Sequence, residues 1–284
     1  MYVVTGAAGF IGSRIVKELN RQGITDIAVV DDLTNGEKFK QLKELEFERY
    51  YDATDLHKSD IKGVRKVFHT GGISSTVETN GRLMMQRNYE DTIQWARYSA
   101  MRDIPMVYTS SASVYGNSTT FCETDPVDPL NVYAYSKAMS EQAIAKYNNI
   151  WTFRPFNVYG AGEDYKGDQA SPISKFAKQQ RERGYVEVFE GSQTTRRDFI
   201  CVDDVVRIMV NYTHTLPGVY NLGTGATETF YNIAGYISND VREIPFPEHL
   251  VGKYQYYSCA NIDKLRTLVG DYEFVKVKDF VSTR

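Results

Sequence analysis

The chain has 284 residues, of which 42% are hydrophobic and 24% charged, and its formal net charge is −3. This length allows one large domain or two intertwined ones, and the composition is that of a globular protein with a sizeable core. Charges of both signs are interleaved along the chain, which excludes the basic stripe of a nucleic-acid-binding protein, and no apolar run is long enough to span a membrane.

Cysteine and histidine spacing gives no sign of a disulfide framework or a metal site. The three cysteines (Cys122, Cys201 and Cys259) lie far apart, and the four histidines are scattered. We therefore expect free thiols in the reducing cytoplasm and no bound metal. The chain opens on the apolar stretch MYVVTGAAGF, without a charged leader or cleavage site, so we expect no secretory signal.

The first residues predict a strand, a turn and a helix that bind a dinucleotide. Residues 2–6 (YVVTG) form a short β-branched run, and apolar residues recur at helical spacing after them. Gly6, Gly9 and Gly12 therefore lie at a strand-to-helix turn. Glycine there permits a tight turn and close approach of the backbone to a pyrophosphate, which the helix N-terminus then faces with free N–H groups. The alternative is a glycine-rich turn in another α/β fold.

A second predicted strand, residues 27–32 (IAVVDD), ends in Asp31 and Asp32. Asp31 follows Gly12 by 19 residues, the position from which an acid holds the adenosine ribose hydroxyls. Both carboxylates would repel the 2′-phosphate of NADP, which favours NAD. Lys38, in the next polar loop, could reach back and offset that repulsion, or it could be a solvated loop lysine. The choice between NAD and NADP therefore stays open.

Strand-like and helical runs alternate through the middle of the chain. Residues 64–72 and 104–116 each contain a strand that breaks into small polar residues, and residues 82–102 between them have helical spacing. This alternation predicts a doubly wound parallel sheet of the Rossmann type, with helices on both faces. Ligands of such sheets bind beyond the carboxyl ends of the strands, which places Thr70–Ser74 and Ser110–Ser113 at the site.

The stretch NVYAYSK (131–137) opens a predicted helix that contains two tyrosines and one lysine. Tyr133 and Lys137 are four residues apart and share a helix face, whereas Tyr135 points roughly the other way. A phenol has a pKa of about 10, and a neighbouring cation or an oxidised nicotinamide lowers it, so that the phenolate can act as a base. Ser111, at the end of the preceding strand, would orient a substrate oxygen. The alternative is a chance Y-x-x-x-K on an exposed helix.

The regular alternation weakens after residue 155, which predicts a smaller, discontinuous C-terminal substrate domain of α/β type. Pro172 begins a predicted helix, and YNLGTG is predicted to return the chain to the main sheet. We assign residues 1–156 plus about 199–225 to the dinucleotide-binding domain, and about 157–198 plus 226–284 to the substrate domain. The cleft between sheet and smaller domain would hold the sugar.

Two arginines stand in a loop predicted before a helix. A guanidinium group offers paired donors to a pyrophosphate, and Arg197 is the candidate because it directly precedes Asp198–Phe199. The alternative for Arg196 and Arg197 is a surface pair without a ligand.

Five motifs, TGAAGFIGS, SSASVYG, NVYAYSK, FRPFNVYG and YNLGTG, follow one another in this order. With them the chain resembles the extended short-chain dehydrogenase/reductases that act on nucleotide sugars, over nearly its whole length. Further stretches, among them VFEGSQTTRRDF and IPFPEHLVGKYQ, are similar to the ADP-L-glycero-D-manno-heptose 6-epimerase branch, which supplies heptose for lipopolysaccharide. The chain departs from that pattern at Asp32, where asparagine is usual, and at Asp168 and Lys175, where the substrate loop has serine and histidine.

The resemblance implies three sets of site residues, which include those named above. The catalytic residues are Ser111, Tyr133, Lys137 and a second acid/base group, Lys166. The cofactor contacts are Gly6, Gly9, Phe10, Ile11, Gly12, Asp31, Asp32, Lys38, Thr70, Gly71, Gly72, Ile73, Ser74, Asn88, Lys137, Val158 and Lys166. The substrate contacts are Asn157, Asp168, Lys175, Phe189, Glu190, Gly191, Ser192, Arg197 and Tyr254.

These residues predict an epimerase that oxidises a sugar carbinol to a ketone and reduces it again, with NAD or NADP bound throughout. Three alternatives stay open. A UDP-hexose 4-epimerase shares nearly every cofactor feature. A nucleotide-sugar 4,6-dehydratase needs an acid to expel water, which SASVYG lacks. A non-catalytic NAD(P)-binding module would be free to lose the tyrosine and lysine. We expect a cytoplasmic homo-oligomer with a nucleotide-sugar substrate and no nucleic-acid or membrane partner.

Overall fold

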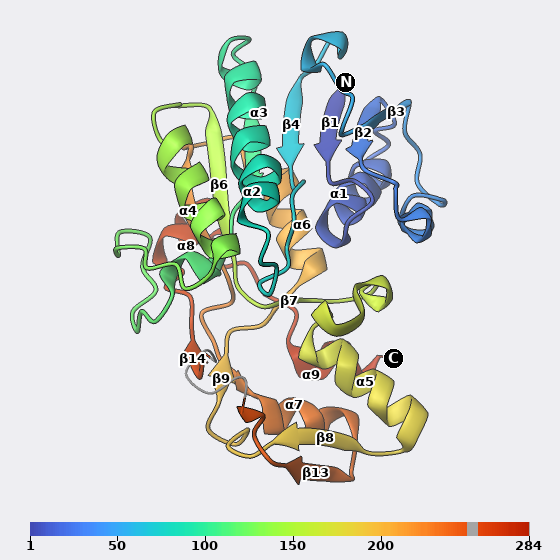
Figure 1. Cartoon of the computed structure of the whole chain (residues 1–284), viewed down its shortest axis with the longest axis vertical. Helices are drawn as coiled ribbons and strands as arrows, with labels where there is room; N and C mark the ends of the chain where they lie inside the picture. Colours follow the sequence, from blue (N-terminus) through green and yellow to red (C-terminus); the bar gives the residue numbers. More distant parts are fainter. Residues whose placement is uncertain (249–254, 284) are drawn as a thin grey trace. The chain divides into compact units, whose positions relative to one another are not determined.

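The computed structural model describes residues 1–248 and 255–283, except for the side chains of Asp164 and Asp168 (Figure 1). The chain forms two compact units, each assembled from separate segments. Unit 1 comprises Met1–Gly116, Pro126–Arg154 and Val205–Tyr220, and unit 2 comprises Asn117–Asp125, Pro155–Asp204 and Asn221–Arg284.

A seven-stranded sheet, most of it in unit 1, has the strand order β11-β6-β5-β4-β1-β2-β3. Its strands are β1 (Tyr2–Thr5), β2 (Ile27–Asp31), β3 (Arg49–Asp52), β4 (Lys66–His69), β5 (Met106–Thr109), β6 (Ile150–Pro155) and β11 (Gly218–Leu222). Neighbouring strands from β3 to β6 pair in parallel. The order reverses between β1 and β4, where doubly wound sheets bind their ligands. The predicted Rossmann-type fold is therefore confirmed.

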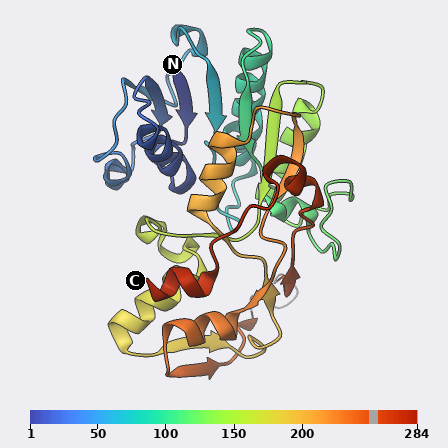
Figure 2. The ribbon, with the colours of Figure 1, turned by 180° about the vertical axis from the view of Figure 1, so that it is seen from behind.

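Helices cover both faces of this sheet (Figures 1 and 2). One face carries α1 (Phe10–Arg21) and α6 (Val202–Asn211), which are linked by a hydrogen bond of 2.8 Å from Gln22 to Asn211. The other face carries α3 (Asp91–Ala100) and α4 (Val132–Ile144). The remaining helical segments of this part are α2 (Gly81–Met84), the π-helical turn η3 (Met85–Glu90), and the 3-10 helices η1 (Gly36–Gln41), η2 (Lys58–Asp60) and η4 (Ala112–Tyr115).

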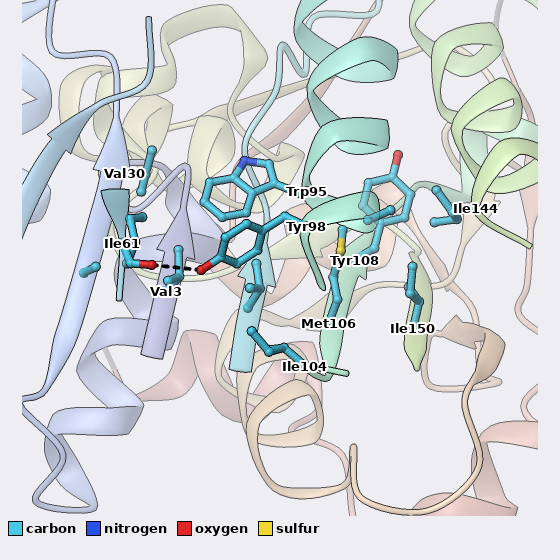
Figure 3. Close-up of a cluster of buried hydrophobic side chains, with 13 residues drawn as sticks. Val3, Val30, Ile61, Trp95, Tyr98, Ile104, Met106, Tyr108, Ile144 and Ile150 are labelled. Carbon is cyan, nitrogen blue, oxygen red and sulfur yellow. Dashed lines mark hydrogen bonds between the residues drawn. The ribbon is translucent and has the colours of Figure 1, made fainter. Parts of the chain in front are cut away.

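Apolar side chains fill the space between the sheet and the helices. Because both faces are covered, the strands read as nearly continuous apolar runs. Val3 and Val67 are completely buried and pack in one cluster with Trp95 and Tyr98 of α3. Figure 3 shows this cluster, in which the Tyr98 hydroxyl donates to the carbonyl of Ile61 at 3.0 Å. The polar end of a large buried ring is thereby satisfied.

Unit 2 contains short strands in three small sheets. They are β10-β7, β12-β9-β14 and β13-β8, formed by β7 (Val158–Tyr159), β8 (Val186–Phe189), β9 (Arg196–Arg197), β10 (Ile200–Cys201), β12 (Glu228–Thr229), β13 (Val241–Ile244) and β14 (Tyr257–Ser258). The loop predicted for Arg196 and Arg197 is therefore wrong. These two residues pair with β12 and β14, and a two-residue polar strand has no alternating pattern that the sequence could reveal.

The helices of unit 2 begin and end at recognisable residues. They are η5 (Asp164–Gln169), α5 (Pro172–Arg183), α7 (Phe230–Ile237), α8 (Asp263–Val269) and α9 (Val277–Ser282). Ser171 caps α5 by accepting a hydrogen bond from the Ser174 N–H, Pro172 follows at the first helical position as predicted, and Gly184 ends the helix with φ +79°. None of the described helices is long and apolar enough to cross a membrane.

One buried carboxylate, that of Asp198, connects three segments of unit 2. It accepts hydrogen bonds from the backbone N–H groups of Thr224 (2.9 Å), Gly225 (3.0 Å) and Ala260 (3.2 Å), and from the Thr224 hydroxyl (2.7 Å). Asp198 and Ala260 are 62 residues apart in the sequence. A single side chain thus fixes the loop after β11 and the loop after β14 to the end of β9.

Candidate functional site

The turn between β1 and α1 has no room for a side chain at Gly6, Gly9 or Gly12. Gly6 has φ +64°, and a Cβ there would lie 2.8 Å from the Gly71 backbone. A Cβ at Gly12 would lie 2.1 Å from the Gly6 carbonyl oxygen. Gly9 precedes α1, and neither a capping side chain nor an acidic residue occupies the first turn of that helix. The turn therefore leaves N–H groups and an open backbone approach, which fits a dinucleotide pyrophosphate.

Two acids and two cations gather at the end of β2. The buried Asp31 carboxylate accepts hydrogen bonds from the N–H groups of Ala8 (2.7 Å) and Asp32 (2.8 Å). Lys38 donates to the same carboxylate and, at 2.9 Å, to the carbonyl of Asp32. The side chain of Asp32 lies 3.5 Å from Arg87. Lys38 thus reaches back to the two acids, as the first interpretation of its position predicted. The alternative, a solvated loop lysine, is wrong.

The side chain of Asn88 holds the loop after β4 by hydrogen bonds. The Asn88 side-chain oxygen accepts from the Ile73 N–H at 2.7 Å, and its amide donates to the Ile73 carbonyl and to the Ser136 hydroxyl, both at 3.0 Å. A Cβ at Gly72 would lie 2.6 Å from the same oxygen. Thr70 donates to the Thr5 carbonyl at 2.7 Å. Asn88 is completely buried, and its contacts fix the shape of this loop.

Helix α4 exposes Tyr135 and buries Lys137, so these two side chains lie on different faces, as the spacing predicts. Asn131 caps the helix by accepting a hydrogen bond from the Ala134 N–H at 2.9 Å. Tyr135 is 47% exposed, whereas Lys137 is 5% exposed. The Lys137 ammonium donates to the Thr109 carbonyl at the end of β5 at 2.8 Å. Lys137 therefore lies at the carboxyl edge of the sheet, where the ligand of such a fold is bound.

Burial is the largest influence on the protonation of Tyr133 and Lys137. Burial raises the pKa of Tyr133, while a hydrogen bond with Ser111 opposes the rise. The lowered pKa predicted for Tyr133 is therefore wrong for the protein alone, because removing a phenolate from water outweighs the favourable contacts. Burial also lowers the pKa of Lys137 to about 8, and the charge of Glu141 opposes this shift. Ser111 itself accepts a hydrogen bond of 2.8 Å from the Ser113 hydroxyl.

In unit 2, Lys166 lies in η5 beside a buried acid. Its ammonium group is 3.6 Å from the carboxylate of Glu163. Glu163 in turn accepts hydrogen bonds from the Gly160 N–H at 3.0 Å and from the N–H and hydroxyl of Ser171, both at 2.7 Å. Burial lowers the pKa of Lys166, and Glu163 opposes that shift. A lysine in this state can give and take a proton closer to neutral pH than a surface lysine.

The substrate residues predicted in unit 2 include a neighbouring pair. The Asn157 amide donates to the Asp198 carbonyl at 2.8 Å, and its side-chain oxygen lies 3.5 Å from the Arg197 guanidinium. Arg197 also donates to the Gln255 carbonyl at 2.5 Å and stands over the ring of Phe230, 5.6 Å from the ring centre. Arg197 is therefore held in place by its surroundings, as a group that receives an anion should be.

The other predicted substrate residues are spread more widely. Residues Phe189–Ser192 form a turn closed by a 3.0 Å hydrogen bond from the Ser192 N–H to the Phe189 carbonyl, and in the described part of the chain the buried Ser192 hydroxyl has no hydrogen-bond partner. Lys175 is exposed on α5. Of the predicted cofactor contacts, Val158 lies in β7, and Phe10 and Ile11 begin α1. The Asp168 side chain and the whole of Tyr254 lie outside the described part of the structure.

Three buried acids, one in unit 1 and two in unit 2, were not identified from the sequence. Glu141, Glu163 and Asp198 are each almost completely buried and each holds several donors. Glu141 could have been found, because it follows Lys137 by one helical turn on the same face. No sequence signal marks Glu163 or Asp198, because their donors are mostly backbone N–H groups from other segments.

Comparison with known proteins places this geometry in a family. Residues 2–223 match the model of the NAD dependent epimerase/dehydratase family. The chain is 41% identical to ADP-L-glycero-D-manno-heptose-6-epimerase of Alkalilimnicola ehrlichii, over 96% of this chain and 93% of that protein.

Solved structures show the same fold. The crystal structure of ADP-L-glycero-D-manno-heptose-6-epimerase from Helicobacter pylori has a TM-score of 0.88 at 24% identity, covering 99% of this chain and 94% of that chain. UDP-N-acetylglucosamine 4-epimerase from Methanobrevibacter ruminantium has a TM-score of 0.85 at 22% identity, covering 99% and 96%. From the family match and the 41% identical relative it follows that the chain belongs to the NAD dependent epimerase/dehydratase family.

Proposed function

We propose that this protein is a nucleotide-sugar epimerase that inverts a sugar carbinol by transient oxidation to a ketone and re-reduction, with the activity of an ADP-L-glycero-D-manno-heptose 6-epimerase. The observation that carries the proposal is the 41% identity to such an enzyme over 96% of the chain. Tyr133, Lys137 and Ser111 supply the acid–base groups that this chemistry needs. We also propose a cytoplasmic homo-oligomer, in keeping with three free cysteines.

The residues of unit 1 fit a nicotinamide dinucleotide. The turn of Gly6, Gly9 and Gly12 and the N-terminus of α1 would hold the pyrophosphate, because a side chain at these glycines would collide with the backbone. Asp31 would accept a hydrogen bond from the adenosine ribose. Lys137 would donate to the nicotinamide ribose. When bound, NAD(P) supplies the hydride acceptor and donor for the reaction.

Proton transfer would be the task of Tyr133. The phenolate of Tyr133 takes the proton of the sugar hydroxyl and later returns it. Lys137 stabilises this phenolate, since its buried ammonium, with a pKa of about 8, still carries a proton at neutral pH. Ser111 orients the substrate oxygen and hydrogen-bonds to the phenol. Burial raises the pKa of Tyr133, so these favourable charges are needed for the phenolate to form.

Lys166 is proposed as the second acid/base group. An inverted carbon receives its hydrogen on the opposite face, so a second proton-transfer group suits an epimerase. Its lowered pKa and its Glu163 partner keep Lys166 able to exchange a proton. Arg197 and Asn157 would bind the pyrophosphate and a hydroxyl group of the nucleotide sugar.

We propose NADP as the resident cofactor. Lys38 contacts Asp31, and Arg87 lies beside Asp32, so each acid that would repel a 2′-phosphate has its own cation. Hydrogen bonds from Thr34, and then the charges of Arg87 and Lys38, lower the pKa of Asp32. A 2′-phosphate bound beside Lys38 would replace Asp31 as a partner of that lysine. NAD would be held by Asp31 alone.

The decisive experiment incubates the purified protein with ADP-, UDP-, GDP- and dTDP-sugars and follows stereochemistry by NMR. We expect inversion of an ADP-heptose and slower or no conversion of UDP-hexoses. Mass spectrometry of the cofactor released by acid should find NADP. Inversion at C4 of a UDP-hexose, with ADP-heptose unchanged, would replace the proposal by a UDP-hexose 4-epimerase.

A further inference from the structure

A buried ion pair lies one helical turn beyond Lys137 on α4. Glu141 on α4 and Arg154 on β6 have side chains that are 8% and 5% exposed. The Arg154 guanidinium donates to both carboxylate oxygens, with distances of 3.1 Å from Nε and 2.5 Å from its terminal nitrogen. The same carboxylate accepts a hydrogen bond from the Ser110 hydroxyl. Removing two charges from water is costly, so a buried pair with this many contacts invites a functional explanation.

The pair joins β6 to the two places where the proposed catalytic residues of unit 1 lie, the end of β5 and helix α4. Ser110 directly precedes Ser111 at the end of β5, and its N–H donates to the Phe153 carbonyl of β6 at 2.7 Å. Glu141 follows Lys137 by four residues and lies on the same face of α4. Arg154 is the neighbour of Phe153 at the end of β6. One carboxylate thus holds β5, α4 and β6 together beside the site, all within unit 1.

Besides joining these three elements, Glu141 acts electrostatically on Lys137. Lys137 donates to the Thr109 carbonyl and stands 5.0 Å from the ring centre of Tyr108. The titratable groups that interact with it are Glu141 from α4, Tyr108 from β5 and His69 from β4, with Arg154 beyond Glu141. Tyr133 precedes it by one turn of α4. Burial lowers the pKa of His69 to about 4 and raises that of Tyr108, so both are neutral near neutral pH. Among these described groups, Glu141 is the one that opposes the loss of the Lys137 proton.

We propose that Glu141 is a positioning residue for the epimerisation proposed above: its carboxylate fixes α4 against the ends of β5 and β6 and keeps the Lys137 ammonium charged, so that Tyr133 can form a phenolate. This inference rests on the proposed function only for its catalytic consequence. The coupling between Glu141 and Lys137 is a property of the folded chain and can be measured without a substrate.

The first test is a double-mutant cycle of Glu141→Gln and Lys137→Met, unfolded in urea at several pH values. At about pH 6.5 the two side chains should stabilise each other, and at about pH 10, where Lys137 has lost its charge, this coupling should be gone. A coupling that is absent throughout, or that does not change with pH, overturns the proposal. If Glu141→Gln does not fold, the cycle is built on Arg154→Met, which removes the cation left unpaired by that substitution.

The second test separates electrostatic tuning from a purely structural role. Glu141→Gln should move the alkaline limb of the kcat profile to lower pH, because Lys137 then loses its proton more easily, with a roughly tenfold lower kcat near pH 8 and an unchanged KM. The double variant Glu141→Gln/Arg154→Met should regain stability against urea and keep the displaced limb. A double variant with the wild-type pH profile would reduce Glu141 to a structural residue.

A matched control removes a charge from an exposed pair. Glu182 lies 3.9 Å from Lys178 on α5, and both side chains are more than half exposed. Glu182→Gln should leave the pH profile and the stability unchanged. If the wild type inverts no sugar, the proposed function fails, while the urea cycle still decides whether Glu141 holds the charge of Lys137.

Discussion

Tyr133 is the residue on which the proposed chemistry depends most. Tyr133→Phe removes the hydroxyl that exchanges the substrate proton and keeps the ring. We expect turnover to fall by about 10²–10⁴-fold, the usual contribution of acid–base catalysis, with the bound cofactor unchanged by mass spectrometry. Tyr135→Phe, on the exposed side of α4, is the matched control and should retain the wild-type rate. Turnover near the wild-type value in Tyr133→Phe would remove this residue from the mechanism.

Lys166 distinguishes two kinds of epimerase. Lys166→Ala removes the second proposed acid/base group, so we expect roughly a hundredfold loss of kcat in the NMR assay. Lys178→Ala removes an exposed lysine from α5 and should have no effect. An unaffected rate in Lys166→Ala would point to a site with one acid/base group, as in the UDP-hexose 4-epimerase alternative.

Lys38 sets the preference between the two dinucleotides. Lys38→Ala leaves Asp31 without its cation, so a 2′-phosphate would meet an uncompensated carboxylate. We expect the ratio of NADP to NAD affinity to fall by about tenfold or more, since charge-assisted hydrogen bonds contribute on the order of 1.5–3 kcal/mol. The measurement is the competition of both dinucleotides for protein stripped of cofactor. An unchanged ratio would show that Lys38 does not contribute to the choice between the two dinucleotides.

Alanine substitutions at Gly6 and Gly23 test whether the turn between β1 and α1 binds the pyrophosphate. Gly6 and Gly23 both have positive φ, +64° and +75°, but only a Cβ at Gly6 would collide with another strand end. Gly23→Ala should therefore cost about 1–2 kcal/mol of stability and keep the cofactor. Gly6→Ala adds the collision with Gly71, so we expect a larger loss of stability in urea and loss of bound dinucleotide. Equal behaviour of the two variants would contradict the proposed pyrophosphate site.

Local patterns identified most elements of unit 1, because their causes are local. The helix from Phe10, the helix that follows Asn131 and the separation of Tyr133 and Lys137 by one turn of it follow from spacing alone. Strand β3 has no such signal, because it is short, begins and ends in charged residues and lies at the edge of the sheet. The direction of the Tyr133 pKa was also beyond the sequence, because it depends on burial by segments distant in the chain.

For the whole molecule, the sequence predicts the doubly wound sheet and the catalytic helix but not the small sheets of unit 2. Strands β9, β12 and β14 have two residues each, and their pairing joins positions up to about 60 residues apart, so no periodicity reveals them. For the same reason the buried acids that hold unit 2 were missed. Lys166 is recognisable only by family resemblance, whereas Tyr133 and Lys137 are recognisable by their spacing and Arg197 by the chemistry of its guanidinium group.

Asp198 makes a prediction for the stability of all of unit 2. Asp198→Ala leaves three backbone N–H groups and one hydroxyl without their common acceptor. We expect a loss of about 3 kcal/mol or more in the urea unfolding of unit 2, since each buried unsatisfied donor costs on the order of 1–3 kcal/mol. Asp271→Ala, at an exposed position, is the control and should change stability little. A loss of similar size in both variants would contradict this account.

The contacts of Asp198 also bear on how the protein is made. A ribosome synthesises the chain from the N-terminus at about 5–20 residues per second, and domains begin to fold as they emerge. The carboxylate of Asp198 can complete its contacts only after Ala260, 62 residues downstream, has been synthesised. Nascent chains that end before this residue should therefore expose an unfinished second unit to chaperones and proteases, while the strands from β1 to β6 are already available to pair.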